Sequence, residues 1–226
     1  MPSDPALLDN PPESQLNTSA EQLLDATAAL LSERTDLDVS LSEIAQRAKL
    51  NSALIKYYFG NKNGLLLAVL ERDSEHAMAA LDHLVQMPIS AEQKLRIHIS
   101  GLINAFHRAP WLNRLINFMI GYSDAASSRR IGEIYVEPML AAYAAIIDQG
   151  VREGAFRPVD PKFLYHSVVG ACEHIFSTTY SGPGPLGSAK ISDETKQAYI
   201  AHVIQLVLNG LSTSPAAADP AERKSG

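Results

Sequence analysis

The sequence predicts an all-α protein. Across its 226 residues, apolar side chains recur at the three- and four-residue spacing of amphipathic helices. No stretch shows a convincing two-residue alternation, which is the pattern of a half-buried strand. Apolar residues make up 46% of the chain and charged residues 19%, a composition that is sufficient for a buried core. We therefore expect a helical globular chain that forms one large or two small domains.

The ends of the chain and its cysteine content indicate its compartment. No apolar run approaches the ~20 residues of a membrane-spanning helix, so no membrane partner is expected. Residues 1–18 are polar and proline-rich, without the basic start and apolar core of a signal peptide, and we expect a disordered tail. The single cysteine, Cys172, excludes an internal disulfide. These features favour a cytoplasmic location.

The most informative stretch is residues 40–62. Ser40 followed three residues later by Glu43 is a capping box, the pattern that starts a helix. A short break follows, where Asn51 can cap a second helix that ends at Gly60. Two helices of about two turns joined by a three-residue turn have the dimensions of a helix-turn-helix.

Charge supports contact between this stretch and nucleic acid. Residues 47–62 contain four cationic residues and no Asp or Glu, in a chain of formal net charge −6. The cations are Arg47, Lys49, Lys56 and Lys62. A local basic face of this kind suits contact with phosphate groups. The acidic residues of the preceding turn, Glu33, Asp36 and Asp38, are expected to point away from DNA.

These residues resemble the DNA-binding motif of the TetR family of transcriptional regulators. The family pattern runs roughly Thr-x-x-x-Ile-Ala-x-x-Ala-Gly-Val-Ser, then Leu-Tyr-x-x-Phe, then Lys and paired leucines. The matching positions here are Ser40, Ile44, Ala45, Ala48, Leu50, Asn51, Ile55, Tyr57, Phe59, Lys62, Leu65 and Leu66. Lys49 stands where the family has Gly, so a non-glycine residue is expected at positive φ. Asn51 replaces the usual Ser, and Lys56 an aromatic residue that is common there.

The resemblance implies a three-helix head followed by a helical effector-binding and dimerisation domain. The expected divisions are a tail at 1–18, a DNA-binding domain at 19–64 with its motif at about 40–59, an effector-binding and dimerisation domain at 65–212, and a second disordered tail at 213–226. A helix over 19–35, with a capping box at Ser19 and Gln22, would complete the head. A long helix from Lys62 towards Pro88 would link the two domains.

The rest of the chain is expected to be helical with short breaks. The expected helices are 91–108, an apolar and buried helix over 111–120, a helix over 131–153, a helix over about 161–179 and a helix over 192–211. Pro138 predicts a kink or a helix start near Glu137. Residues 181–188, rich in Gly and Pro, are expected to form a loop. By the resemblance, helices about 161–179 and 192–210 form a homodimer interface. On the residues alone they could equally be core helices of a monomer.

The second helix of the motif, residues 52–59, is expected to enter the major groove. Ser52, Ala53 and Lys56 are candidates for base contacts, with Lys56 donating to guanine and Ala53 touching a thymine methyl group. Candidates for phosphate contacts are Ser40, Asn51, Tyr57 and Lys62. Tyr58 is assigned to packing.

A pocket for a small-molecule effector is expected among the middle helices. The candidate lining residues are Trp111, Arg114, Asn117, Phe118, Tyr122, Cys172, His174 and Phe176, with His98 and His107 nearby. Aromatic stripes at helical spacing also occur as ordinary core. His166, Cys172 and His174 are too widely spaced for a metal site, so neither metal nor cofactor is expected.

The sequence shows no motif of an enzyme: there is no phosphate-binding glycine loop, GxSxG or HExxH. We therefore expect a ligand-responsive regulator that binds a palindromic DNA operator as a homodimer. That it represses transcription is implied by the resemblance. The alternative is a helical protein-interaction module without sequence-specific DNA binding.

Overall fold

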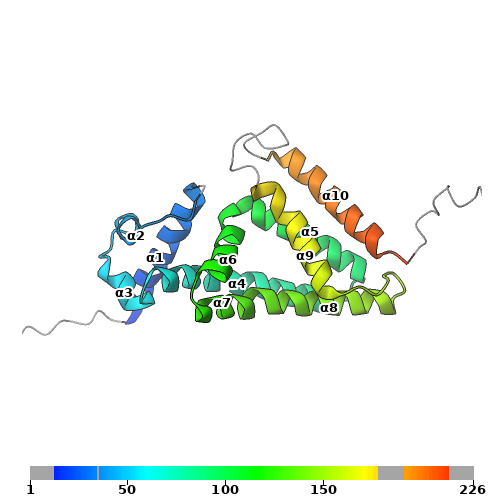
Figure 1. Cartoon of the computed structure of the whole chain (residues 1–226), viewed down its shortest axis with the longest axis horizontal. Coiled ribbons are helices and arrows are strands. Elements are labelled where there is room, and N and C mark those ends of the chain that lie inside the picture. The colour runs from blue at the N-terminus through cyan, green and yellow to red at the C-terminus, as the bar shows by residue number, and fades with distance from the viewer. Residues whose placement is uncertain (1–12, 35, 178–190, 214–226) are drawn as a thin grey trace, which may run out of the picture. The chain divides into compact units, whose positions relative to one another are not determined.

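The computed structural model describes residues 13–34, 36–177 and 191–213, and every regular element in this part of the chain is a helix (Figure 1). In chain order the elements are α1 (Glu13–Glu33), α2 (Leu41–Ala48), α3 (Ala53–Phe59), α4 (Lys62–Gln86), α5 (Ala91–Arg108), α6 (Pro110–Tyr122), α7 (Ala125–Ile131), the π-helix η1 (Gly132–Val136), α8 (Glu137–Arg152), α9 (Pro161–Ser177) and α10 (Asp193–Leu211). The all-α prediction is confirmed. None of the described helices is long and apolar enough to cross a bilayer.

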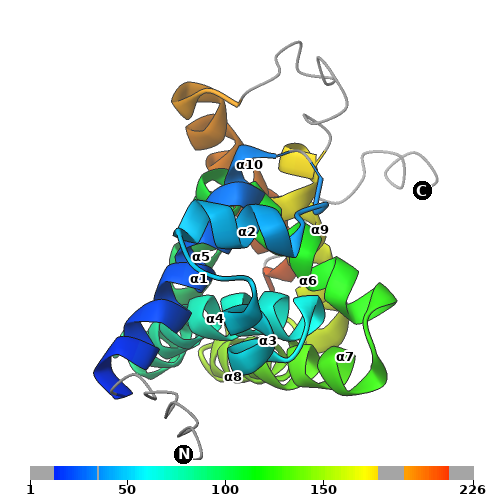
Figure 2. The same ribbon diagram turned by 90° about the vertical axis from the view of Figure 1, so that its left-hand side faces the viewer.

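The chain divides into two compact units, Met1–Val69 and Leu70–Gly226. The first unit contains α1, α2, α3 and the start of α4, and Figure 2 shows α2 and α3 as two short helices. Helix α1 packs against both of them. The core of this unit consists of fully buried aliphatic side chains, namely Leu23, Leu31, Ile44, Ile55 and Leu65. Each such side chain contributes roughly 1.5–3 kcal/mol through its removal from water.

Helix α1 begins earlier than the sequence analysis predicted. It starts at Glu13 instead of Ser19, so Ser19 and Gln22 lie inside the helix and form no capping box there. Pro12 directly precedes the helix in the sequence, and the next proline or glycine in the chain is Gly60. The remainder of the expected tail, residues 1–12, lies outside the described residues.

Helix α5 is central to the second unit. It packs against α6, α8, α9 and α10. Its buried stripe of Leu95, Ile99, Ile103 and Phe106 belongs to a core completed by the other helices, with Tyr143, Val168, Cys172 and Ile204 among its members. Tyr199 of α10 donates a hydrogen bond from its hydroxyl to the carbonyl of Ala171 on α9, at 2.6 Å.

The composition of α6 predicted a helix that is buried on all sides, but the structure buries only one side of it. Trp111, Leu115 and Met119 form a buried stripe with a four-residue spacing. On the other side Ile120 is 42% exposed and Tyr122 is 81% exposed, with the Phe118 ring stacked on Tyr122 at 5.8 Å. The unit covers only one face of this helix, so its remaining apolar residues lie at the surface.

The stretch expected to form one helix over 131–153 contains the last residue of α7, a π-helical turn and α8. Asp124 caps α7 through its carboxylate, which accepts hydrogen bonds from the amides of Ala126 and Ser127 at 3.1 and 3.0 Å. The π-helix η1 follows, where the Glu137 amide donates to the Gly132 carbonyl five residues back. Helix α8 starts at Glu137, as one of the two predictions for Pro138 stated. Pro138 lacks an amide hydrogen, so the wider turn stands where the regular ladder would lose a bond.

The remaining helix ends agree with their sequence signals. Asp160 caps α9, accepting a hydrogen bond from the Lys162 amide at 2.8 Å. Ser192 caps α10 through the Thr195 amide at 3.2 Å. Gly154 adopts a φ of +71° after α8. The expected loop at 181–188 and residues 214–226 of the expected C-terminal tail lie outside the described residues.

Candidate nucleic-acid interface

The start of α2 has the predicted capping box. The Ser40 hydroxyl accepts a hydrogen bond from the Glu43 amide at 3.2 Å, and the Glu43 carboxylate accepts one from the Ser40 amide at 2.8 Å. The hydrogen bonds from Ser40, followed by one from Arg34, lower the pKa of Glu43 to about 2. Ser40 itself is exposed at the N-terminus of α2, where the free amide groups of the helix favour anions.

The turn between α2 and α3 places Lys49 in the left-handed region, as predicted. Its φ is 57° and its ψ is 36°. The Lys49 amide donates to the Gln46 carbonyl at 3.1 Å, and the Leu50 amide donates to the Ala45 carbonyl at 2.9 Å. This pair of hydrogen bonds is a Schellman motif, which usually has glycine at the left-handed position. The turn therefore forms despite its non-glycine residue.

Helix α3 presents a polar face to solvent. Asn51 caps it, with its side-chain oxygen accepting from the Ala53 amide at 2.8 Å and its carbonyl accepting from the Leu54 amide at 3.0 Å. Ile55 is the side chain that anchors the helix, because it is fully buried. The four exposed residues on the opposite side are Ser52, Ala53, Lys56 and Tyr57, and Tyr57 is 68% exposed. Tyr58 is half-buried and packs edge-on against the rings of Tyr57 and Phe59.

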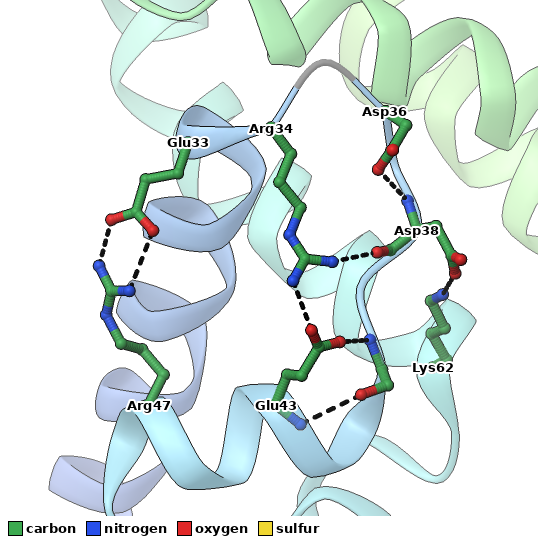
Figure 3. A network of polar contacts seen from close by, with 8 residues as sticks. Glu33, Arg34, Asp36, Asp38, Glu43, Arg47 and Lys62 are labelled. Atoms are coloured by element: carbon green, nitrogen blue, oxygen red, sulfur yellow. Dashed lines mark hydrogen bonds and ion pairs between the residues drawn. The ribbon is translucent and has the colours of Figure 1, made fainter.

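Two of the four cations in residues 47–62 are paired with acidic side chains, which the sequence analysis did not foresee (Figure 3). Arg47 donates two hydrogen bonds to the carboxylate of Glu33 on α1, one of them at 3.0 Å. Lys62 Nζ lies 3.8 Å from Asp38 Oδ1. Glu33 and Asp38 were expected to point away from DNA, yet each forms an ion pair with one of the four cations of residues 47–62. No sequence motif marks these pairs, since Glu33 and Arg47 stand 14 residues apart.

Arg34, which follows α1, connects to the residues at the start of α2. Arg34 donates to the carbonyl of Asp38 and to the carboxylate of Glu43 (Figure 3). Asp36 accepts a hydrogen bond from the Asp38 amide at 3.0 Å. The hydrogen bonds therefore fix the backbone just before α2. Within the described chain, Lys49 and Lys56 form no ion pair and are exposed, so they carry the uncompensated positive charge of this face.

The junction of α3 and α4 is a close backbone contact. A Cβ atom on Gly64 would lie 2.0 Å from the Phe59 carbonyl oxygen. The Gly64 amide donates to the Asn61 side chain at 2.9 Å, and Gly60 adopts a φ of 75°. Glycine at 64 therefore allows α4 to start immediately behind α3, which sets the position of the exposed α3 face within the first unit.

The eight candidate pocket residues do not form one group. Trp111, Cys172 and Phe176 are buried, and burial raises the pKa of the Cys172 thiol to about 12. Asn117, Tyr122 and His174 are exposed. Arg114 and Phe118 have intermediate exposure. Their role in effector binding stays a prediction. A cavity of about 300 Å³ instead lies along α4 and α5, and its lining includes His98 but none of the eight candidates.

Comparison with known proteins gives two family matches. A family described as "Bacterial regulatory proteins, tetR family" matches residues 23–69, which include α2 and α3. A second, described as "Tetracyclin repressor-like, C-terminal domain", matches residues 88–216. The two matches together extend over most of the chain. The first lies within the unit Met1–Val69 and the second within the unit Leu70–Gly226.

Curated relatives carry the name HTH-type transcriptional regulator BetI. The BetI of Escherichia coli strain UMN026 is 40% identical over 122 residues, which are 49% of this chain and 62% of that protein. The BetI of Escherichia coli strain HS is 40% identical over 83 residues, 35% of this chain and 42% of that protein. The chain thus spans less than two thirds of the length of the curated relatives it matches.

Solved structures share the fold at low sequence identity. The transcriptional regulator FadR of Bacillus subtilis, in complex with stearoyl-CoA, has a TM-score of 0.68 and 18% identity, and covers 84% of this chain and 98% of its own. A TetR-family regulator of Pectobacterium atrosepticum has a TM-score of 0.58 and 20% identity, over 90% and 98% of the two chains. These similarities show a shared fold.

Proposed function

The chain belongs to the TetR family of bacterial regulatory proteins, and from this we propose that it represses transcription by binding a palindromic operator as a homodimer. Proteins of this family are DNA-binding transcriptional regulators and not enzymes. They bind operators as dimers and respond to small-molecule effectors. We place the action of this protein in the cytoplasm, where its DNA lies.

The observation that carries the proposal is the exposed face of α3. Ser52, Ala53, Lys56 and Tyr57 are all exposed, while Ile55 fixes the helix from behind. An α-helix with such a face fits the major groove, where Lys56 can donate to guanine and Ala53 can touch a thymine methyl group. We assign Ser40, Asn51, Tyr57 and Lys62 to phosphates. The boundaries we propose for the DNA-binding domain are residues 19–64.

The operator test uses selection from a pool of random duplexes at two salt concentrations, followed by sequencing of the retained DNA. We expect an inverted repeat whose half-sites lie about one helical turn, ~34–36 Å, apart. The variant Lys56→Ala should relax the selected sequence at one position of each half-site. Arg129→Ala removes an exposed cation of α7 that forms no ion pair among the described residues, and it serves as the matched control. Retention of no sequence at either salt concentration would overturn the proposal in favour of a protein-interaction module.

We propose α9 and α10 as the dimer interface. Their residues Val168, Ile200, Ile204 and Leu208 are already buried within one chain, so they are not free for a partner. Phe163 on α9 and Leu206 on α10 are 73% and 61% exposed and line the same groove of about 450 Å³. Large apolar side chains on both sides of a groove are suited to be the anchors of a subunit interface.

The dimer test is the mass of the full chain by light scattering during size-exclusion chromatography. Phe163→Glu and Leu206→Glu should each shift the chain towards the monomer, because they bury a charge in the interface. Ile120→Glu on α6 is the matched control, since Ile120 is also an exposed apolar residue but lies outside the groove. A dimer that persists in both groove variants would place the interface elsewhere.

We propose a small-molecule effector for the second unit. The FadR of Bacillus subtilis forms a complex with stearoyl-CoA, so a chain of this fold can accommodate an acyl ligand. Effector binding would favour a conformation that binds the operator less well, so that the two ligands oppose each other.

A further inference from the structure

Residues of α4 and α5, with Met139 of α8, line a cavity of about 300 Å³ in the second unit, and we call it the α4–α5 cavity. Most of its lining is apolar, including Met78, Leu81, Leu84, Leu102 and Met139. Two side chains in the lining carry polar groups, those of His98 and Arg108. An apolar slot with a few polar groups is the usual composition of a small-molecule site.

His98 is a buried residue with unused hydrogen-bonding capacity. Its side chain is 8% exposed, and its Nε2 atom has no hydrogen-bond partner in the described part of the protein. The hydroxyl of Tyr143, whose ring lies edge-on to His98 at 5.2 Å, is also buried and without a partner there. Buried polar atoms that form no hydrogen bond cost free energy, which a ligand with a polar group can recover.

The two polar side chains lie at different points along the cavity. His98 and Arg108 are ten residues apart on α5, which corresponds to ~15 Å along the helix axis. The lining residues run from Ala77 to Leu84 on α4 and from Ile97 to Arg108 on α5, and Met139 of α8 completes them. Arg108 is exposed and forms no ion pair among the described residues, whereas His98 lies inside.

The chemistry of the two positions differs. Burial lowers the pKa of His98 to about 4, so the ring is neutral at pH 7 and suits a neutral group such as a hydroxyl. An anion is better placed at the exposed guanidinium of Arg108, where it keeps part of its hydration and gains a charge-assisted hydrogen bond. A volume of about 300 Å³ lies at the lower end of the ~300–1,000 Å³ range of small-molecule sites, which suits a short-chain ligand.

We propose that the α4–α5 cavity binds an elongated carboxylic acid that carries a hydroxyl group at its far end. The carboxylate contacts Arg108, the apolar chain lies along the apolar lining, and the hydroxyl reaches His98, the buried polar side chain among the lining residues. That this acid acts as the effector rests on the proposed function, whereas its binding to the cavity does not.

Three probes of equal chain length test the proposal by isothermal titration calorimetry with the full chain. They are 8-hydroxyoctanoate, octanoate and 1,8-octanediol. We expect 8-hydroxyoctanoate to bind one molecule per chain, and octanoate to bind about tenfold more weakly because it leaves His98 without a hydrogen-bond partner. The diol should also bind about tenfold more weakly, because it offers Arg108 no charge.

A cavity-filling variant tests the location. Gly101 lines the cavity, and a Cβ atom there meets nothing within 4 Å, so Gly101→Leu adds a side chain without a clash. This variant should fold and lose binding of all three probes. Gly121→Leu on α6 is the matched control, since a Cβ there also meets nothing within 4 Å and Gly121 is not among the cavity residues. It should bind as the wild type does.

Side-chain variants test the two ends. His98→Leu should remove the preference for 8-hydroxyoctanoate over octanoate, and Arg108→Gln should remove the preference for 8-hydroxyoctanoate over the diol. Equal binding by wild type and Gly101→Leu, or no binding of any probe, would overturn the site. Since these titrations contain no DNA, a chain that binds the acid but selects no operator overturns the proposed function alone. A chain that selects an operator but binds no probe overturns this site alone.

Discussion

The ammonium group of Lys62 lies 3.8 Å from the carboxylate of Asp38, within the surface that we propose for DNA (Figure 3). Both side chains are accessible to solvent, so this ion pair is screened and weak. A phosphate group and Asp38 would compete for the same ammonium group. The pair therefore lowers DNA affinity instead of assisting it.

Removal of the Asp38 charge should strengthen operator binding. We expect Asp38→Asn to bind about threefold more tightly at low salt, because Lys62 no longer has a competing carboxylate. Fluorescence anisotropy with a labelled operator measures the change. Asp36→Asn removes the same charge two residues earlier, where no lysine is paired, and should have a smaller effect. If both variants gained equally, general charge and not the Lys62 pair would be the cause.

The turn between α2 and α3 should become more stable with glycine at position 49. Lys49 has a φ of 57°, which costs a residue with a Cβ atom about 1 kcal/mol. Lys49→Gly should therefore raise the free energy of unfolding by up to about 1 kcal/mol, the gain being reduced by the flexibility of glycine in the unfolded chain. Urea denaturation followed by circular dichroism gives the value. Lys49→Ala keeps the strained backbone and should bring no gain.

A methyl group at position 64 should disturb the recognition helix. The added Cβ would lie 2.0 Å from the Phe59 carbonyl oxygen, so α3 and α4 must move apart. We expect Gly64→Ala to cost roughly 1–3 kcal/mol of stability and to weaken operator binding by more than about tenfold. Gly121→Ala, at an uncrowded helix position, should instead stabilise by up to about 1 kcal/mol. Wild-type affinity in Gly64→Ala would contradict the close contact.

Stability should fall in mild acid because of His98. Burial lowers its pKa to about 4 in the folded protein, against ~6.5 for an unfolded histidine. Between these values the unfolded chain binds the extra proton, so the stabilisation is complete above pH ~6.5 and is lost as the pH falls towards 4. The difference amounts to about 3 kcal/mol. Urea titrations at pH 7 and pH 4.5 should show a smaller acid loss in His98→Leu than in wild type. Parallel losses would contradict a buried neutral ring.

Features that depend on neighbouring residues could be predicted from the sequence. The caps at Ser40, Asn51, Asp160 and Ser192 all agree with the structure, because each cap bonds to an amide two or three residues away. The positive φ of Lys49 followed from the family pattern. Helix α7 was missed although Asp124 offered the same kind of signal.

Features that depend on distant parts of the chain could not be predicted in this way. The pairing of Arg47 with Glu33 requires that α1 and α2 pack together, and spacing in the sequence does not reveal it. The exposure of Tyr122 depends on which helices cover α6. For the same reason, composition alone grouped Tyr122 with the buried Phe176 as pocket residues, although the structure gives them opposite environments.

The π-helical turn before Pro138 also bears on how this chain should be aligned with its relatives. Ile131, Tyr135 and Met139 are all buried at successive four-residue steps. In a regular α-helix eight residues turn through about 800°, which would rotate Met139 some 80° away from the face of Ile131. The extra residue in 132–136 absorbs this rotation. A homologous sequence that is one residue shorter here should therefore be given its gap inside 132–136, so that both flanking helices keep their buried faces in register.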